Sequence, residues 1–357
     1  MASSSTDLSK DPAGQSRRAR RRGRVYAAID LGTNNCRLLV ARPAKRGFQV
    51  VDAFSRIVRL GEGLTRRGAL SEEAMERALG ALNICAGKIE RRGARHVRAV
   101  ATEACRQAAN CDDFLARVRD RTGIALEIIS SSVEAHLALH GCAPLLDLRR
   151  PNALVFDIGG GSTQVSWLEV SPATSNGRWS NRPSANLRAW HSVPIGVVTL
   201  AERYGGHSIS RAVYEAMIED VVEPLARFET EQQLGGLVAE GQMQMVGTSG
   251  TVTTLAGVHK KLPRYNRARV DGTHLDFGTV RRLSGEIAAM SYDQRLVHPC
   301  IGRERADLVV AGCAILEAIC RTWPVGRLRV ADRGLREGIL FNLMQANSEA
   351  RAAPRNG

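Results

Sequence analysis

Aromatic side chains are scarce in this chain of 357 residues: they make up 4% of it, although 44% of the residues are hydrophobic. The scarcity disfavours an all-β sandwich built on aromatic strands. It also disfavours a protein that stacks the bases of single-stranded nucleic acid on aromatic rings. The core must consist mainly of Ala, Leu, Val and Ile. This length and hydrophobic content predict one very large globular domain or two ordinary ones.

Long apolar runs and paired cysteines are missing as well. The best apolar run, Leu308–Leu316, lies between Asp307 and Glu317. It is far shorter than the ~18 to 20 residues of a membrane span and predicts a buried helix. The 8 cysteines form no CxxC pair and no zinc spacing, which indicates reduced thiols in the core. No apolar segment of a signal peptide follows Arg18. We therefore expect a cytoplasmic protein that does not contact a membrane.

Lysine is almost absent. Only five of the 50 basic residues are Lys, so 45 are Arg, and the net charge is +14. This balance indicates a polyanionic partner without identifying it. Residues 1–24 hold seven basic and two acidic residues and have no period that could bury a face, so we expect a disordered basic tail. This tail either contacts nucleic acid or is a solvated leader without a dedicated role.

Strand and helix signals alternate from residue 25 onward. They predict strands at 25–29, 36–41, 48–58, 97–101 and 126–129, and helices at 71–92, 104–107, 112–121 and 132–140. The pattern restarts with strands at 153–156, 165–168, 244–246 and 327–330, and helices at 199–204, 211–229, 279–289, 292–296 and 305–321. Ser71 is expected to cap one helix and Gly141 to end another. Residues 171–186 are polar and predict an exposed hairpin or loop.

Two α/β halves follow from this restart. We expect domain I at residues 25–143, domain II at 144–333, a C-terminal helix at about 334–347 that packs back on domain I, and a disordered tail at 348–357. The fold class predicted is α/β.

One local pattern occurs twice: an apolar strand runs into Asp, an aliphatic residue and Gly, and a second strand returns. The first copy contains Asp30, Gly32, Thr33, Asn34 and Asn35, and the second, 127 positions later, contains Asp157, Gly159, Gly160, Gly161, Ser162 and Thr163. We call residues 30–35 the first glycine loop and residues 157–163 the second.

Glycine lets backbone amides approach an anion closely, and the hydroxyl and amide side chains add donors. An Asp beside phosphate makes sense with a divalent cation between them, so Asp30 and Asp157 predict a site for Mg²⁺ or Mn²⁺. Two such loops on opposing domains predict a phosphate clamp.

Three common phosphate and nucleophile motifs are excluded. The Gly-Lys pair of a Walker A loop occurs only at Gly87, where Ile89 replaces the required hydroxyl residue. The dinucleotide motif fails because Gln164 stands at its third glycine. The nucleophile elbow fails because Thr251 stands at its final glycine.

The paired loops resemble the two phosphate motifs of the actin, heat-shock chaperone and sugar-kinase superfamily. Within it the sequence is similar to the exopolyphosphatase/guanosine pentaphosphate phosphohydrolase family from about residue 25 to 343. Further matching segments are 101–110, 127–135, 247–251 and 334–338. The resemblance implies two RNase H-like (actin-like ATPase) domains with an active-site cleft between them.

The resemblance also assigns roles. From the residues alone, Glu134 is equally well a carboxylate that stabilises the start of a helix. The resemblance makes it the catalytic base that prepares a water molecule. Arg106 falls on the family's phosphate-binding Arg, and Arg37 is a second candidate because guanidinium suits bidentate phosphate contacts. His136 and His140 lie four residues apart, but no third ligand accompanies them, so we interpret them as helix-surface or cleft residues.

Three positions depart from the family's pattern. Gln164 stands where Glu is common, Ser131 where Gly is common, and Val133 where an acidic residue is common. Gln164, a further candidate near the metal, keeps the shape of Glu without its charge. Metal affinity, pH profile or substrate choice can therefore differ. The length matches the short, two-domain form of the family, which lacks the helical domains that extend the polyphosphate-binding surface.

These expectations converge on a Mg²⁺- or Mn²⁺-dependent hydrolase that removes terminal phosphate from inorganic polyphosphate. Guanosine pentaphosphate is the rival substrate. Three rival functions stay open: a phosphotransferase or ATPase of the same superfamily, a non-catalytic sensor of guanosine tetra- or pentaphosphate or polyphosphate, and a tail-driven nucleic-acid binder. The oligomeric state stays open too, with a homodimer as the assembly considered.

Overall fold

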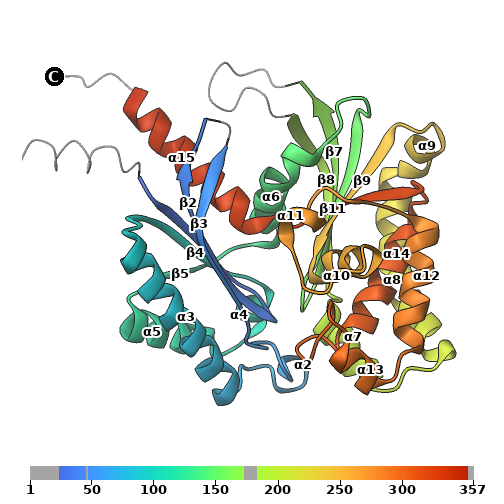
Figure 1. Cartoon of the computed structure of the whole chain (residues 1–357), viewed down its shortest axis with the longest axis horizontal. Helices are drawn as coiled ribbons and strands as arrows, with labels where there is room; N and C mark the ends of the chain where they lie inside the picture. The colour runs from blue at the N-terminus through green and yellow to red at the C-terminus, as the bar shows by residue number, and fades with distance from the viewer. Residues whose placement is uncertain (1–23, 46, 173–182, 353–357) are drawn as a thin grey trace, which may run out of the picture.

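The computed structural model describes residues 24–45, 47–172 and 183–352 and contains two β-sheets side by side (Figure 1). In the first sheet the order is β3-β2-β1-β4-β5, with β1 (Tyr26–Leu31), β2 (Asn35–Pro43), β3 (Phe48–Ile57), β4 (His96–Ala101) and β5 (Leu126–Ile128). In the second the order is β10-β11-β9-β6-β7-β8, with β6 (Asn152–Ile158), β7 (Thr163–Ser171), β8 (Ser184–Val193), β9 (Met243–Ser249), β10 (His274–Asp276) and β11 (Arg327–Ala331).

The two sheets share a topology. In each, three consecutive strands form an antiparallel meander. A later strand then pairs in parallel with the first strand of the meander, and another pairs in parallel with that later strand. β10 extends the second sheet by an antiparallel pair with β11. The repeat seen in the two glycine loops is therefore a repeat of whole topology, and each loop is the turn between the first two strands of its sheet.

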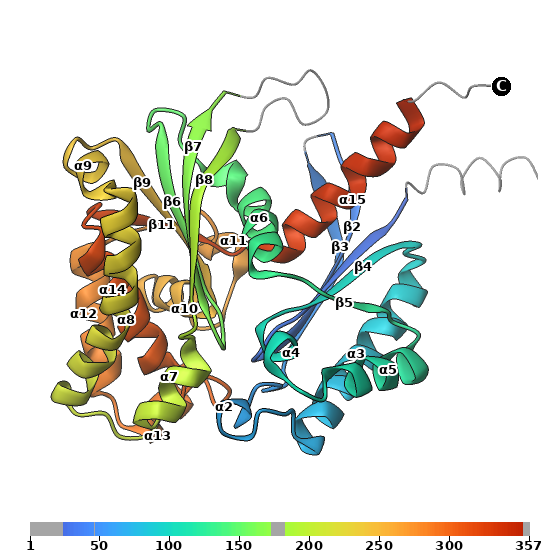
Figure 2. The same cartoon turned by 180° about the vertical axis from the view of Figure 1, so that it is seen from behind.

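Helices cover the outer faces of both sheets and also lie between them (Figure 2). The first half contains α2 (Leu64–Arg67), α3 (Glu72–Arg92), α4 (Glu103–Gln107) and α5 (Cys111–Thr122), followed by α6 (Ser131–Cys142) and the 3₁₀ turn η1 (Ala143–Leu145). The second half contains α7 (Val197–Tyr204), α8 (Arg211–Gln232), α9 (Leu234–Ala239), α10 (Gly250–His259), α11 (Arg267–Val270), α12 (Phe277–Ala289), α13 (Tyr292–Val297) and α14 (Val309–Thr322), and α15 (Leu335–Ala352) follows.

The central strand β1 is buried on both faces of the first sheet, and its side chains alternate between two cores. Ala27, Ile29 and Leu31 belong to the core beneath α3 and α5. Tyr26 and Ala28 point to the opposite face, where they pack with residues of α15 and α6. The C-terminal helix therefore returns to the first sheet after the second sheet is complete.

α6 lies between the two sheets and packs on both. Leu137 belongs to the core that joins α15 to the first sheet, while Leu139 and Cys142 belong to the inner core of the second sheet. Glu134 lies in the first turn of this helix, which Ser130 caps by accepting a hydrogen bond from the Val133 amide at 3.3 Å. The helix that carries the predicted base is thus held by both halves of the molecule.

Gly141 does not end α6, contrary to the sequence-based expectation, because the helix continues to Cys142. The glycine instead permits a close helix crossing with the start of α15. A Cβ at Gly141 would lie 2.0 Å from the Gly334 carbonyl oxygen, and a Cβ at Gly338 would lie 1.8 Å from the Leu137 carbonyl oxygen. Two glycines therefore let the backbones of α6 and α15 touch.

Two further elements differ from the expectation. The C-terminal helix extends past residue 347 to Ala352, and Asn347 is bonded on both sides: its Nδ2 donates to Leu343 O at 3.0 Å and its Oδ1 accepts from Arg24 at 3.2 Å. β8 begins at Ser184, inside the segment expected to be an exposed hairpin or loop; it pairs antiparallel with β7, in agreement with the hairpin, but it continues to Val193, beyond that segment. The expected tails at 1–24 and 348–357 otherwise lie outside the described residues, as does most of the loop.

Several expectations are confirmed. Ser71 caps α3, with its hydroxyl accepting from the Ala74 amide at 3.2 Å, and the helix ends at Arg92 as predicted. All eight cysteines are buried and unpaired. No helix in the described part of the chain is long and apolar enough to cross a membrane.

Candidate active site

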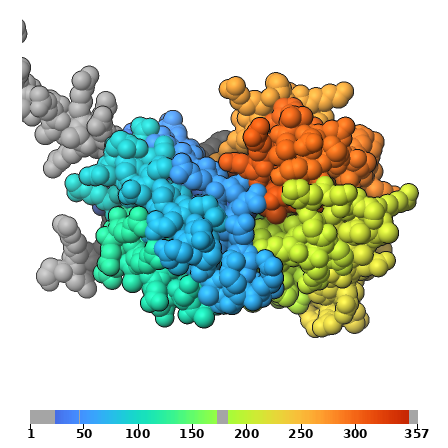
Figure 3. Space-filling model, turned by 90° about the horizontal axis from the view of Figure 1, so that it is seen from below, coloured from blue at the N-terminus to red at the C-terminus, as the bar shows by residue number. Residues whose placement is uncertain are grey.

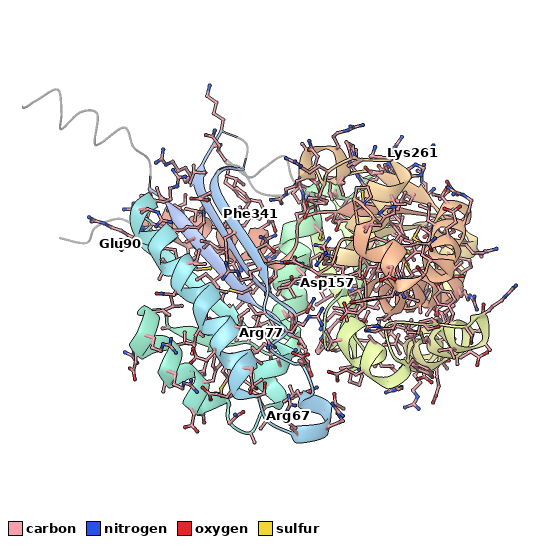
Figure 4. The ribbon with its side chains drawn as sticks, turned by 60° about the horizontal axis from the view of Figure 1, so that its bottom comes forward. Arg67, Arg77, Glu90, Asp157, Lys261 and Phe341 are labelled. Carbon is pink, nitrogen blue, oxygen red and sulfur yellow. The ribbon has the colours of Figure 1, made fainter. Side chains whose placement is uncertain are left out.

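A cavity of about 460 Å³ lies between the two halves, at the carboxyl ends of the parallel strands. Figure 4 shows the labelled Asp157 between the ribbons of the two halves, and Figure 3 shows those halves meeting when viewed from below. Twelve predicted site residues line the cavity: Asp30, Gly32, Thr33, Asn34, Asn35, Arg37, Glu134, Asp157, Gly159, Gly160, Gly161 and Ser162. The fold therefore gathers residues that are more than one hundred positions apart in the chain.

The first glycine loop is a tight turn between β1 and β2. The Gly32 amide donates to the Asn35 carbonyl at 2.9 Å. The Asn34 carbonyl accepts from the amides of Val58 and Arg59, at 2.8 and 3.0 Å, so its backbone faces away from the cavity and is fixed. The side-chain amide oxygen of Asn34 is buried without a partner among the described residues. The loop thus presents a polar group that the protein itself leaves unsatisfied.

The second glycine loop approaches the first directly. The Gly159 amide donates to the Ser162 carbonyl at 2.9 Å and closes the turn. A Cβ at Gly160 would lie 3.0 Å from the Thr33 Cβ, and a Cβ at Gly161 would lie 2.9 Å from the Thr33 Oγ1. The two loops therefore face each other at van der Waals distance, and glycine is needed for this approach.

Thr163 and Gln164 do not line the cavity, although they follow the second loop. The Thr163 hydroxyl is fully buried and donates to the Ile195 carbonyl at 2.7 Å. The Gln164 side-chain amide donates to the Ser162 hydroxyl at 2.8 Å. The two residues brace the loop from behind, so Gln164 can influence the cavity only through Ser162.

Three carboxylates that the sequence predicted as site residues line the cavity, Asp30, Glu134 and Asp157, and Glu103, Asp332 and Glu337 line it too. Burial raises the pKa of Glu134 to about 7; Arg106 opposes this increase, and Asp157 and Asp30 add to it. Burial likewise raises the pKa of Asp157 to about 7, and it raises the pKa of Asp30 against the opposing charge of Arg37. Perturbed carboxylates gathered in one cavity are typical of functional sites.

Arg106 lies behind Glu134 rather than on the cavity wall. Its Nη1 donates to Glu134 Oε2 at 2.9 Å and to the Ile129 carbonyl at 2.8 Å. Its Nε donates to Glu103 Oε2 at 3.0 Å, and its Nη2 pairs with the same oxygen. All three donor nitrogens are therefore used within the protein, and the guanidinium orients the Glu134 carboxylate in this conformation.

Three arginines line the cavity without an ion pair to any described carboxylate: Arg37, Arg305 and Arg336. Burial lowers the pKa of Arg305, and the Arg37 charge adds to this decrease. Burial also lowers the pKa of Arg336, against the attraction of Glu337. Guanidinium groups that form no ion pair and line one cavity can bind a polyanionic ligand.

The second half adds hydroxyl groups and a helix start. Thr248 and Ser249 at the end of β9, and Gly250 and Thr251 at the start of α10, line the cavity. A helix start offers free amide groups and a partial positive charge to anions. Arg305 is positioned there, since its Nη1 donates to Thr254 Oγ1 at 3.3 Å.

Arg305 and Arg336 were not predicted as site residues. Arg336 lies in the segment 334–338 that resembles the family's terminal motif, so a signal existed for it. Arg305 has no such signal in a chain with 45 arginines. His136 and His140 lie elsewhere on α6: His136 Nδ1 is 2.8 Å from the Ser132 carbonyl, and His140 Nδ1 is 3.1 Å from Asn342 Oδ1.

A comparison with protein families settles the relationship. The sequence model of the Ppx/GppA phosphatase family matches residues 39–347. The chain belongs to the Ppx/GppA phosphatase family. The match covers most of the chain and includes the second glycine loop, Glu134 and Arg336.

Solved structures of Ppx/GppA relatives share the fold. An exopolyphosphatase from Cytophaga hutchinsonii is 24% identical with a TM-score of 0.78, and the alignment covers 90% of this chain and 98% of that one. The Aquifex aeolicus family member is 26% identical with a TM-score of 0.69, covering 91% and 98%. An exopolyphosphatase-like protein is 26% identical with a TM-score of 0.77, covering 90% and 99%. The predicted fold class, two actin-like ATPase domains of the α/β type, is confirmed.

Proposed function

We propose that this protein hydrolyses the terminal phosphoanhydride bond of inorganic polyphosphate. The observation that carries the proposal is the position of Glu134, a carboxylate with a pKa of about 7, in a cavity whose lining includes two facing glycine loops and three arginines without an ion pair. Membership of a phosphatase family supports it. So does the similarity to an exopolyphosphatase-like protein.

The loops and arginines would hold the terminal phosphates. Backbone amides of the two glycine loops can approach the oxygens closely, and Thr33 and Ser162 add hydroxyl donors. Arg37, Arg305 and Arg336 would neutralise successive phosphates. Because phosphoryl transfer depends mainly on positioning and charge neutralisation, this wall would provide much of the catalysis.

Glu134 would act as the base. Its ionised form can accept a proton from the attacking water, and a pKa near the working pH gives a base that is both ionised and basic enough. Arg106 would act as a positioning residue, because it holds the Glu134 carboxylate rather than lining the cavity. We therefore propose that Arg106 must be released from Glu134 before its guanidinium can contact phosphate.

Asp30 and Asp157 fit a divalent cation, Mg²⁺ or Mn²⁺. No described basic residue forms an ion pair with either carboxylate, and their pKa values are raised. Within the described ranges, no group of three or more His, Cys, Asp or Glu could hold a metal on its own. Magnesium suits such a site, because it commonly binds one or two carboxylates and completes its shell with water and substrate phosphates. When bound, it would neutralise charge on the phosphoryl oxygens.

Guanosine pentaphosphate is the second candidate substrate. Two aromatic side chains, Phe54 and Tyr265, line the same cavity and offer flat surfaces on which a guanine base could stack. Polyphosphate needs no such surface. We place polyphosphate first because most of the polar wall suits phosphate rather than a base.

The test is phosphate release from polyphosphate of several lengths and from guanosine pentaphosphate, each with and without Mg²⁺. We expect release from polyphosphate only with the metal. Faster release from guanosine pentaphosphate would reverse the substrate order, and a Phe54→Ala variant should then lose that substrate selectively. Absence of release from every substrate, together with measurable binding, would establish the non-catalytic sensor and overturn the proposal.

A further inference from the structure

A second cavity, of about 310 Å³, lies at the other end of the second sheet. It shares no lining residue with the catalytic cavity. β9 and β11 run in parallel, and they contribute residues near their amino ends, Met245 and Arg327 among them, to this second cavity. Their carboxyl ends contribute Thr248 and Ala331 to the catalytic cavity. The two cavities therefore lie at opposite ends of the same strands.

The second cavity is strongly basic. Four arginines line it, Arg149, Arg150, Arg327 and Arg329, against the single carboxylate of Asp147. Arg149 already pairs with Asp147, with its Nη2 2.7 Å from Oδ2. The other three form no ion pair with a carboxylate in the described part of the chain. About three positive charges thus face one small volume without compensation.

Two of these arginines are held in place by the backbone. Arg150 Nη1 donates to the Met243 carbonyl at 2.7 Å, and Arg329 Nη1 donates to the Leu145 carbonyl at 2.7 Å. The Nε of Arg329 is buried and has no hydrogen-bond partner among the described residues. A buried donor without a partner is costly. The geometry is that of a site with its donors already oriented.

The pKa of His274 is lowered by burial and by the positive charge of the neighbouring arginines, Arg329 and Arg327. This residue lies on β10 at the cavity wall. At neutral pH its imidazole is therefore uncharged and can donate one further hydrogen bond. The apolar wall, Leu145, Met245 and Val325, limits the volume available to water.

We propose that this cavity is a second, non-catalytic site for a small anion with two or three linked phosphates. Forked guanidinium groups match phosphate oxygens in pairs, and three uncompensated arginines match the charge of a di- or triphosphate. The volume is at the small end of the range for small-molecule sites, about 300–1,000 Å³, so a long polymer does not fit inside it. Free pyrophosphate and the diphosphate of a nucleotide share this chemistry.

The test is calorimetric titration of the Glu134→Gln chain at ~0.15 M salt, where weak surface attraction is screened. Pyrophosphate and ADP are the probes, and binding of one or both identifies the source of the phosphate group. We expect two classes of pyrophosphate site. Adding Arg327→Glu should weaken one class at least tenfold, whereas adding Arg37→Ala should weaken the other.

Matched variants keep the test decisive. Arg91→Glu changes an exposed arginine on α3 outside both cavities and should leave both classes unchanged. If Arg327→Glu unfolds, His274→Glu places a negative charge in the same cavity from an exposed position. The proposal is overturned by a single class of site that only Arg37→Ala removes, by two classes that both survive the Arg327 and His274 changes, or by no binding. Phosphate release is also measured for a chain that carries Arg327→Glu alone and keeps Glu134. This measurement distinguishes a failure of anion binding in the second cavity from a failure of the proposed hydrolysis.

Discussion

Glu134 is surrounded by groups that shift its pKa in opposite directions. Burial, Asp157 and Asp30 raise the pKa, while Arg106 lowers it, and the result is about 7. A base must be ionised to accept a proton, so activity should rise with pH through about 7. The pH at which activity rises, the acid limb of the pH–rate profile, depends on Arg106, because its guanidinium donates a hydrogen bond directly to the Glu134 carboxylate.

Replacing Arg106 by Met should therefore move the acid limb of the pH–rate profile upward by at least about one unit, since the remaining influences all raise the pKa of Glu134. Turnover should fall more at pH 6.5 than at pH 8.5. Arg98→Met is the matched control, because Arg98 pairs with Glu127 outside the cavity. An unshifted limb in Arg106→Met would contradict the positioning role.

Asp157 should affect stability in the metal-free protein. Its pKa is about 7 when folded and 3.8 ordinarily, so between these values the folded state holds a proton that the unfolded state releases. The contribution of this group to stability is fully present below about pH 4 and is lost as pH rises through about 7. Asn cannot ionise, so Asp157→Asn removes this loss of stability at high pH. Its melting temperature should exceed that of the unaltered chain by a few degrees at pH 8.5 and by much less at pH 5, and an equal difference at both pH values would refute the assignment.

The sequence was informative about residues inside recurring motifs and silent about isolated ones. Glu134 could be assigned as the base only through the family resemblance, and Arg37 was a candidate because guanidinium suits bidentate phosphate contacts. Arg305 could not be predicted, because its place in the cavity depends on a bond to Thr254, fifty-one positions earlier. Arg106 was predicted as a phosphate ligand, whereas its engagement by Glu103 and Glu134 depends on side-chain geometry that spacing alone does not reveal.

At the scale of elements, the crossing of α6 and α15 fixes the helix that carries Glu134. Gly338→Ala would put a Cβ 1.8 Å from the Leu137 carbonyl, so the two helices would have to separate. We expect a loss of unfolding free energy of about 2 kcal/mol or more and a loss of phosphate release in the fraction that stays folded. Thermal unfolding and turnover measure the two effects.

Gly285→Ala is the control for that change. It lies inside α12, and a Cβ there meets nothing within 4 Å. The substitution should stabilise the protein by up to about 1 kcal/mol through helix propensity alone. If Gly338→Ala behaved like Gly285→Ala, the close crossing would not exist in solution.

Most of the errors in predicting helices and strands from the sequence occur where glycine or polar residues mask the element. Gly141 resembles a helix end in sequence, yet it serves a contact with Gly334, which is nearly two hundred positions away. β8 was missed because its residues alternate between exposed and half-buried, so no apolar run marks it. α10 was missed because its first turn is Gly and Thr, which sequence patterns associate with loops.

At the scale of the whole molecule, the two halves also touch on the side of the cavity away from the α6–α15 crossing, where α2 lies beside α7 (Figure 1). Arg59 pairs with Asp307 at 2.8 Å, and the Gly63 amide donates to Glu202 Oε1 at 2.7 Å. We call these two contacts the α2 clasp. Because they bridge the halves, they favour the closed arrangement in which the glycine loops meet.

Arg59→Ala should therefore weaken closure around substrate. A half-buried charged contact of this kind contributes on the order of 1 kcal/mol, which corresponds to an increase in KM of about fivefold. We expect kcat to change less than twofold. Arg203→Ala breaks an ion pair with Asp220 inside the second half and should leave KM unchanged. An equal effect of both variants would show that the clasp does not control closure.

The chain's charge of +14 is not concentrated in the catalytic cavity, where five arginines face six carboxylates; the second cavity does have a basic excess, with four arginines and one carboxylate. The repeat of two α/β halves could be predicted from the glycine loops, because each loop marks the first turn of its sheet. The way the halves face one another could not, since it depends on glycine contacts between residues 33 and 160 that no local pattern encodes.

The most direct test of the central claim is the rate of phosphate release from polyphosphate by Glu134→Gln, measured with Mg²⁺ beside Glu127→Gln. Glu127 is an exposed glutamate on β5 outside the cavity. The account predicts that Glu134→Gln lowers turnover by about 10²–10⁴-fold, the usual contribution of a general base, while the variant stays folded and binds pyrophosphate like the unaltered chain. Turnover within threefold of the unaltered chain, matching that of Glu127→Gln, would contradict it.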